Sequence, residues 1–258
     1  MIGNIERYLL NQIEEKGAIH ITLIDPENVT AKSVLPIVRK AEKCNTSAIM
    51  VGGTTLVSTR HLDNVVRAIK GVISIPVILF PNNVTGITRY ADAIWFMSLL
   101  NSSDPYFIAG AQVLGAPLIK KFGLEPIPLG YIIVGEGGSV GVIGRACPIP
   151  RNKPELAAAF ALAAQYFGMR FVYLEAGSGA KLPVPKEMIR TVKNMIDIPL
   201  IVGGGIRTKS QASDIVGAGS DIIVTSTVLE ESDIEGLEKK IKEIMEGIKE
   251  GVNKRYRR

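Results

Sequence analysis

The chain has 258 residues, of which 47% are hydrophobic, 21% charged and 6% aromatic. This composition excludes a disordered chain, and the length allows one closed α/β barrel or two smaller domains. No apolar run approaches the roughly 18 residues of a membrane-spanning helix, and the N-terminus lacks a signal-peptide pattern. Cys44 and Cys147 cannot form a disulfide framework and match no zinc motif. We therefore expect a cytoplasmic protein.

The formal net charge of +5 raises the question of nucleic-acid binding. Four of the positive charges lie in residues 253–258, which leaves a net charge of only +1 on the rest of the chain. A basic tail is weaker evidence for phosphate-backbone contact than a basic stripe on a folded face. We interpret it as a frayed, solvated terminus or as favourable charge at a helix C-terminus, and we expect no nucleic-acid partner.

Short β-branched segments alternate with helical stretches along the chain. The predicted strands are mostly continuous apolar runs, which indicates burial on both faces, as in a parallel sheet covered by helices. Strands are predicted at 18–25, 48–53, 76–80, 93–100, 127–134, 171–175, 200–202 and 221–225. Helices are predicted at 31–44, 63–70, 105–122, 154–167, 186–195, 209–216 and 234–251.

Eight strands with helical connections in about 250 residues match a (β/α)8 barrel. An open, doubly wound sheet explains the same alternation with fewer strands. No linker or change in composition divides residues 1–258, so we expect a single domain. Residues 81–91, which follow the third strand, are too short and too rich in turn and β-branched residues for an ordinary crossover helix. We predict that the third helix is missing or reduced, and that a gap for an elongated ligand results.

Glycines and hydroxyls follow the last two predicted strands. Gly203-Gly204-Gly205-Ile206-Arg207-Thr208 comes after the seventh strand and Thr225-Ser226-Thr227 after the eighth. In barrels of this type these two loops bind phosphate, because bare glycine amides and a helix N-terminus attract an anion. The alternative is that the glycines only form a tight turn. A Walker loop is excluded, because no Gly-Lys-Ser/Thr sequence ends this glycine run or the one at residues 135–141.

Two carboxylates lie at the ends of predicted strands, where barrel enzymes carry their chemistry. Asp25 follows the first strand and, with Thr54, has oxygen ligands suited to a divalent cation, although a turn residue explains Asp25 equally well. Glu175 ends an apolar strand, so burial would raise its pKa and suit it to proton abstraction, with Tyr173 on the same face. A buried structural carboxylate is the alternative.

The remaining polar and aromatic features are less specific. We interpret His20 as a hydrogen-bonded core residue and His61 as a surface or capping residue before a helix, and neither supports a hydrolase triad. Residues 95–97 and 105–107 hold aromatic side chains that belong either to the barrel core or to a groove for a long hydrocarbon. Residues 135–147 are rich in glycine and suit a mobile loop that closes over a substrate.

Several segments resemble the geranylgeranylglyceryl phosphate synthase family. They are Leu23–Pro26, Val51–Thr54, Trp95–Ser102, Tyr173–Gly179 and Val202–Arg207, in family order between about residues 20 and 230. The resemblance implies a modified (β/α)8 barrel without its third helix. It also implies a prenyltransferase that uses Mg²⁺ to join geranylgeranyl diphosphate to sn-glycerol 1-phosphate, forming the first ether bond of archaeal membrane phospholipids.

The resemblance assigns roles to individual residues. Asp25 and Thr54 would ligate Mg²⁺, and Glu175, with Tyr173 beside it, would accept the proton of the glycerol hydroxyl. Many relatives have glycine where this chain has Ser226, which puts the local geometry of the phosphate site in doubt. The residues expected to hold glycerol 1-phosphate are Tyr173, Leu174, Glu175, Ala176, Gly177, Ser178, Gly179, Gly204, Gly205, Ser226 and Thr227.

Other activities stay open at this stage. One alternative is a heptaprenylglyceryl phosphate synthase, which uses a longer prenyl donor. A phosphosugar isomerase or lyase would share the phosphate site, as would a barrel that binds phosphate without catalysis. The family forms homo-oligomers, so we expect a dimer or larger assembly. A lipid substrate and product also suggest peripheral contact with a membrane.

Overall fold

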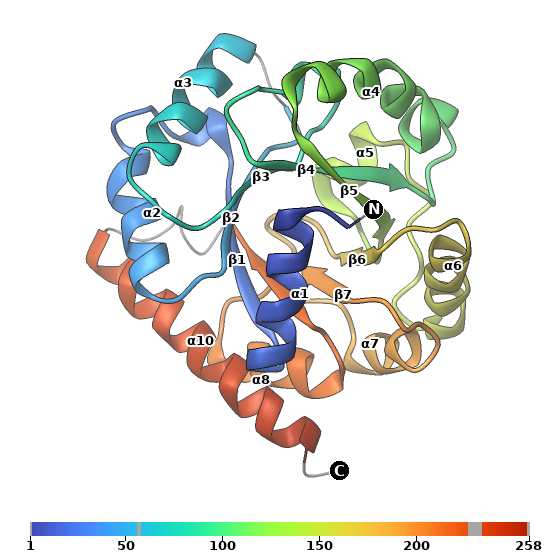
Figure 1. The fold of residues 1–258 in the computed structure, drawn as a ribbon. Coiled ribbons are helices and arrows are strands. Elements are labelled where there is room, and N and C mark those ends of the chain that lie inside the picture. Colours follow the sequence, from blue (N-terminus) through green and yellow to red (C-terminus); the bar gives the residue numbers. More distant parts are fainter. Residues whose placement is uncertain (1, 56–57, 227–233, 257–258) are drawn as a thin grey trace.

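The computed structural model describes residues 2–55, 58–226 and 234–256. Eight parallel strands close into a barrel in which each strand pairs with its neighbour in the sequence and β8 pairs with β1 (Figure 1). The predicted (β/α)8 barrel is therefore confirmed, and the open sheet is wrong. The strands are β1 Ile19–Ile24, β2 Ala48–Val51, β3 Val77–Leu79, β4 Ala93–Leu99, β5 Glu125–Ile133, β6 Phe171–Glu175, β7 Leu200–Gly203 and β8 Ile222–Thr225.

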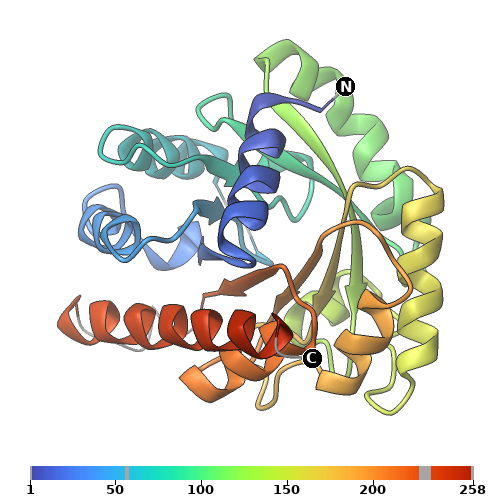
Figure 2. The same ribbon diagram turned by 60° about the horizontal axis from the view of Figure 1, so that its bottom comes forward.

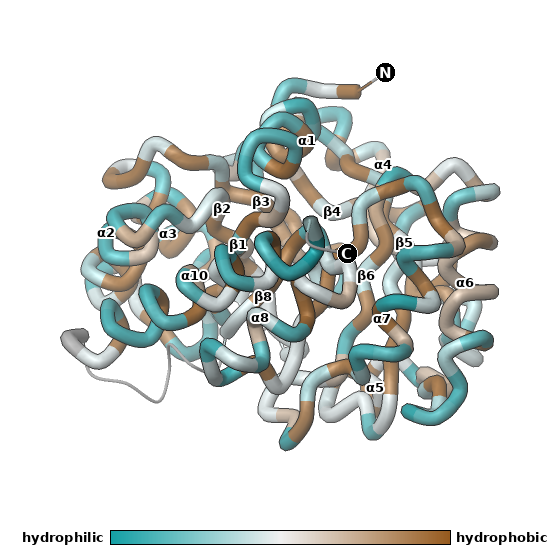
Figure 3. Tube along the Cα trace, turned by 90° about the horizontal axis from the view of Figure 1, so that it is seen from below, coloured by the Kyte–Doolittle hydropathy of each residue, from teal (hydrophilic) through white to brown (hydrophobic). Residues whose placement is uncertain are grey.

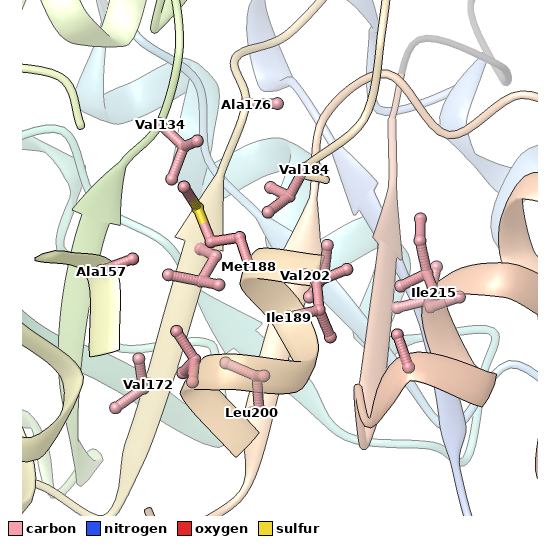
Figure 4. Close-up of a cluster of buried hydrophobic side chains, with 14 of the residues drawn as sticks. Val134, Ala157, Val172, Ala176, Val184, Met188, Ile189, Leu200, Val202 and Ile215 are labelled. Carbon is pink, nitrogen blue, oxygen red and sulfur yellow. The ribbon is translucent and has the colours of Figure 1, made fainter. Parts of the chain in front are cut away.

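Alternate residues of each strand serve two apolar layers, because successive side chains point to opposite faces. Ile19 and Ile21 of β1 belong to the cluster inside the barrel. Val172 and Val202 point outward and pack against the helices that surround β6 and β7 (Figure 4). Burial on both faces is the reason that the strands read as continuous apolar runs.

Helices surround the barrel, and α10 runs along α8 on the outside (Figure 2). Hydrophilic residues recur along the outer side of α10, as expected for a solvated face (Figure 3). In the described part of the chain, none of the helices combines the length and the apolar character needed to cross a bilayer. The helices are α1 Asn4–Lys16, α2 Val34–Lys43, α3 Thr59–Lys70, α4 Ala111–Phe122, α5 Gly138–Ile143, α6 Pro154–Tyr166, α7 Lys186–Lys193, α8 Lys209–Ala218 and α10 Ile234–Tyr256.

The third unit of the barrel is defective, as predicted. Between β3 and β4 the chain forms only η2, a 3₁₀ turn at Val84–Gly86, in place of a crossover helix. Asn83 begins this turn, and its side chain accepts a hydrogen bond of 2.7 Å from the Thr85 amide. The ring of helices therefore has a gap between α3 and α4.

The N-terminal helix α1 was not predicted from the sequence. It crosses the end of the barrel at which the strands begin (Figure 1), and Leu9 packs fully buried into the barrel cluster. The carboxylate of Glu125 accepts hydrogen bonds from the amides of Ile5 and Glu6 at 2.9 and 2.8 Å, which satisfies the free N–H groups of the first turn. This helix closes the end of the barrel opposite to the predicted site.

Helix α10 continues through Tyr256 and has Lys254 and Arg255 in its last turn. Of the two interpretations of the basic segment, favourable charge at a helix C-terminus is therefore confirmed for these residues and a frayed terminus is wrong, whereas residues 257–258 lie outside the described chain. The Arg255 guanidinium donates to the carbonyls of Val216 and Gly17, at 2.8 and 3.3 Å, and also to the Ser220 carbonyl. It also pairs with Asp221 at 3.3 Å. Arg255 therefore ties α10 to the C-terminal end of α8 and to the segments that precede β1 and β8.

We predict that Arg255→Ala lowers the free energy of unfolding by about 2 kcal/mol, because several buried carbonyls lose their donor at once. Lys254→Ala is the matched control, since Lys254 is 54% exposed and makes only a surface pair with Asp214. We expect this control to lower the free energy of unfolding by less than about 0.5 kcal/mol. Urea unfolding of both variants measures the difference, and equal losses would contradict the anchoring role of Arg255.

Candidate active site

Glu175 is the central polar group of the barrel mouth. It is the last residue of β6, and only 6% of its surface is exposed. Its Oε1 accepts a hydrogen bond of 2.7 Å from the Gly177 amide, and the hydroxyls of Tyr131 and Tyr173 donate to the same carboxylate. Three donors thus converge on one buried acid, as expected for a carboxylate that is held in a fixed position.

The protonation of Glu175 reflects two opposing effects. Burial raises the pKa of the carboxyl group above its ordinary value, and this effect is larger than the lowering of the pKa by the three hydrogen bonds. Burial and the charge of Glu175 in turn raise the pKa of both tyrosines, so their hydroxyls stay protonated as donors. A carboxylate with a raised pKa is a stronger base than one in water.

Tyr131 was missed by the sequence analysis. It lies on β5 directly in register with Tyr173 on β6, and the two rings are 5.2 Å apart. Phe80 packs against both rings, at 5.3 Å from Tyr131 and 5.7 Å from Tyr173. The only signal in the sequence was a tyrosine within an otherwise apolar strand, and its partner depends on the register between two strands.

Gly203 and Gly204 leave the space that this arrangement needs. A side chain at Gly203 would collide with the Tyr173 hydroxyl, and one at Gly204 would collide with Oε1 of Glu175. Gly204 also has a φ of +83°, in the region that glycine adopts without strain. The glycine run after β7 therefore admits the Tyr173–Glu175 pair and does more than form a tight turn.

A small pocket, partly open to solvent and with a space of about 400 Å³, lies beside Glu175 and is lined by both polar and apolar residues. Arg207 forms part of the pocket wall, and its Nη1 donates a hydrogen bond of 2.6 Å to the Ala180 carbonyl. The predicted glycerol-phosphate residues that line the pocket are Tyr173, Glu175, Ser178, Gly204, Gly205 and Ser226.

Other predicted residues take different positions. The side chains of Leu174 and Ala176 pack in the layer between barrel and helices, so only their backbone can face the site. Gly177 donates its amide to Glu175, and Gly179 is exposed beyond the pocket. Thr227 lies outside the described residues.

A second, elongated cavity of about 1170 Å³ begins at the barrel mouth and runs into the gap left by the missing helix. We call it the groove. Asp25 and Thr54 lie at its polar end. Its apolar walls come from β4, η2, α4 and α5, from Ile87 after η2, and from Phe107 in the π-helical turn η3, Tyr106–Gly110. The predicted gap for an elongated ligand is therefore present.

The groove and the small pocket meet at shared residues. Glu175, Ser178 and Ser226 line both cavities, as does Leu23. The carboxylate of Glu175 is therefore accessible from both cavities.

The predicted aromatic segments are divided between core and groove. Trp95 is fully buried inside the barrel against Phe171, at 5.2 Å between ring centroids, and also lines the groove together with Phe96 and Phe107. Both interpretations of these aromatic residues are thus partly correct. Within residues 135–147, the short helix α5 contributes Val140 and Ile143 to the groove, while its predicted closing motion stays a prediction.

The loop that carries Asp25 is fixed from two sides. Oδ1 of Asp25 accepts the Glu27 amide at 3.0 Å and starts the 3₁₀ turn η1, Pro26–Asn28. His61, which lies inside α3 and not before it, places Nε2 at 2.8 Å from the Pro26 carbonyl and 2.9 Å from the Val29 carbonyl. Since carbonyls only accept, Nε2 carries a proton. The interpretation of His61 as a surface or capping residue is therefore wrong: His61 ties this loop to α3.

The residues around Asp25 suit a cation that is bound by few protein ligands. Among the described residues, no three His, Cys, Asp or Glu side chains cluster as a complete ligand set. Mg²⁺ does not require one, because it retains several waters and commonly binds through one or two carboxylates and substrate phosphates. The bare Gly53 leaves the Asp25 carboxylate room at the mouth, since a side chain there would collide with both of its oxygens.

We predict that Tyr131→Phe raises the pKa of Glu175 further, because the variant loses a donor that stabilises the charged form. An infrared pH titration of the carboxyl band, assigned with Glu175→Gln, measures the shift. Tyr8→Phe is the control, since its hydroxyl bonds the Ser47 carbonyl instead. An unchanged or lowered pKa in Tyr131→Phe would contradict the arrangement described here.

Comparisons with known proteins place this chain in a family. Residues 11–248 match the model of the PcrB family. The chain is 54% identical over 249 residues to the geranylgeranylglyceryl phosphate synthase of Pyrococcus abyssi, covering 96% of this chain and 99% of that protein. It is 51% identical over 257 residues to the synthase of Thermofilum pendens, covering all of both.

A solved structure is similar over the whole barrel. It is the (S)-3-O-geranylgeranylglyceryl phosphate synthase of Thermoplasma acidophilum in complex with its substrate sn-glycerol-1-phosphate. The TM-score is 0.91 at 41% identity, covering 97% of this chain and 100% of that one. The chain therefore belongs to the PcrB family, together with the geranylgeranylglyceryl phosphate synthases that it matches.

Proposed function

We propose that this protein is a geranylgeranylglyceryl phosphate synthase, which transfers the prenyl group of geranylgeranyl diphosphate to a hydroxyl of sn-glycerol 1-phosphate and releases diphosphate. The observation that carries the proposal is the position of Glu175, where a small polar pocket and a long apolar groove meet. The names of the relatives support the same reaction.

Glycerol 1-phosphate suits the small pocket. Gly204, Gly205 and Ser226 line this pocket and would offer backbone N–H groups to the phosphate, and Arg207 would add positive charge near it. With the phosphate held there, the glycerol hydroxyls extend toward Glu175. Holding both reactants in one orientation lowers the entropic part of the barrier.

Glu175 is the proposed general base. Its carboxylate accepts the proton of the attacking hydroxyl as the new C–O bond forms and the allylic C–O bond to diphosphate breaks. Tyr131 and Tyr173 keep the carboxylate oriented by donating to it, and the raised pKa of Glu175 favours proton uptake. The apolar walls of the groove exclude water from the electron-poor allylic carbon.

Asp25, with Thr54 beside it, is the proposed ligand for Mg²⁺. When bound, this ion would neutralise the negative charge that develops on the departing diphosphate. Both residues lie at the polar end of the groove, where the diphosphate of a prenyl donor would rest.

Incubation of the purified protein with labelled glycerol 1-phosphate, Mg²⁺ and prenyl diphosphates of several lengths tests the function. We expect an ether product, with geranylgeranyl diphosphate preferred. A preference for the heptaprenyl donor would assign the protein to the longer-chain branch. Turnover of a sugar phosphate without prenyl diphosphate, or ligand binding without product, would contradict the proposal.

We predict that Asp25→Asn raises the Mg²⁺ concentration for half-maximal activity by about tenfold or more, the order expected for the loss of one charged ligand. Glu27→Gln is the control, because Glu27 is an exposed carboxylate two residues away. A metal titration of both variants is the measurement. An unchanged titration for Asp25→Asn would remove Asp25 from the metal site.

We predict that Gly115→Leu shifts the preference toward shorter prenyl donors. Gly115 of α4 lines the groove, and a Cβ there would already lie 3.1 Å from Cδ1 of Ile87, which also lines it. The Michaelis constant for glycerol 1-phosphate should not change. Val113→Leu on the exposed side of the same helix is the control, and an equal donor profile in both variants would contradict this path for the prenyl chain.

A further inference from the structure

Four polar side chains are buried at the seam where β1 meets β8, on the outer side of the barrel. They are His20, Thr22, Thr46 and Thr225, and none is more than 5% exposed. Their strand neighbours Ile19, Ile21 and Val224 point into the barrel, so His20, Thr22 and Thr225 point the other way. That layer is elsewhere almost entirely apolar in the described chain, so a polar cluster here needs a reason.

Hydrogen bonds link His20 to two of these threonines. Nδ1 of His20 lies 2.8 Å from Oγ1 of Thr46, and Nε2 lies 2.8 Å from Oγ1 of Thr225. Oγ1 of Thr46 also lies 3.2 Å from the His20 carbonyl and 3.2 Å from Oγ1 of Thr22. Burial lowers the pKa of His20 to about 4, so the ring is neutral at neutral pH, and one ring nitrogen donates while the other accepts.

Thr225, the last residue of β8, is paired with β1 but not with β7. The pairing of β8 with β7 ends one residue earlier, at Gly203 and Val224, whereas the pairing with β1 reaches Thr22 and Thr225. On the β7 side the chain opens into the phosphate pocket, which Thr225 and Ser226 line. The hydrogen bond to His20 is therefore a second tether on the end of β8, next to Ser226.

We propose that His20 is a positioning residue for the phosphate pocket: through Thr225 it fixes the end of β8 and so the position of Ser226, which lines this pocket. The inference rests on the proposed function, in which this pocket holds glycerol 1-phosphate. Thr225 lines the small pocket but not the described walls of the groove, so we expect the larger effect on the phosphate substrate.

Calorimetric titration with sn-glycerol 1-phosphate tests the tether. Thr225→Val removes the hydroxyl at constant shape and should raise the Kd roughly five- to tenfold, the loss of one buried hydrogen bond. Thr225→Ser keeps the hydroxyl and should restore most of the affinity. His20→Leu should weaken binding to a similar degree, and the double variant His20→Leu/Thr225→Val no further, because both remove the same bond. The Michaelis constant for the prenyl donor should change less than the Kd for sn-glycerol 1-phosphate in each variant.

Val192→Ala is the control for a general loss of stability, since Val192 is fully buried on α7 and should leave the Kd unchanged. Wild-type affinity in Thr225→Val, equal losses in Thr225→Val and Thr225→Ser, or effects that multiply in the double variant would overturn the inference. If His20→Leu does not fold, the Val and Ser variants of Thr225 decide the question. Wild-type protein that binds sn-glycerol 1-phosphate but forms no ether would contradict the proposed function alone.

Discussion

The site depends on one buried carboxylate. Removing the charge of Glu175 from water is costly unless donors replace the lost hydration, and the Gly177 amide and the hydroxyls of Tyr131 and Tyr173 provide them. Each donor comes from a different part of the barrel mouth, so the acid is correctly held only when β5, β6 and the loop after β6 are all in place. The same requirement explains Gly203 and Gly204, which leave room for the phenol and the carboxylate.

The groove has a topological origin. In an ordinary (β/α)8 barrel a helix would cover the strand at the third position, whereas here only the short turn η2 follows β3. The outer apolar face of β4 thereby becomes the wall of a cavity that continues to Glu175. A fold that usually confines its ligand to the barrel mouth can in this way accept a ligand much longer than the mouth is wide.

Much of the barrel was predictable because its signals are local. Doubly buried strands read as apolar runs, and the length and composition of the third connection were enough to rule out an ordinary helix there. Asp25, Glu175 and the glycines after β7 were found because parallel strands bring their carboxyl ends to one rim. Strand-end residues can therefore be read directly from the order of segments.

The features that were missed depend on contacts between distant segments. Helix α1 is capped by Glu125, which is about 120 residues away in the sequence. Tyr131 reaches Glu175 only through the register of β5 and β6, and Arg255 acts on the carbonyls of Val216 and Gly17, far from it in the sequence. His61 likewise bonds backbone carbonyls of another loop. A sequence pattern gives the type of such a residue but not its partner.

The central claim is that Glu175 accepts the proton of the attacking hydroxyl at the meeting point of the two cavities. A single-turnover measurement with Glu175→Gln tests it most directly, because the amide keeps the shape and an oxygen acceptor for Gly177 but is not a base. The account predicts that ether formation slows by roughly 10²-fold or more, while sn-glycerol 1-phosphate binds with nearly wild-type affinity. A near-normal rate of ether formation in this variant would contradict it.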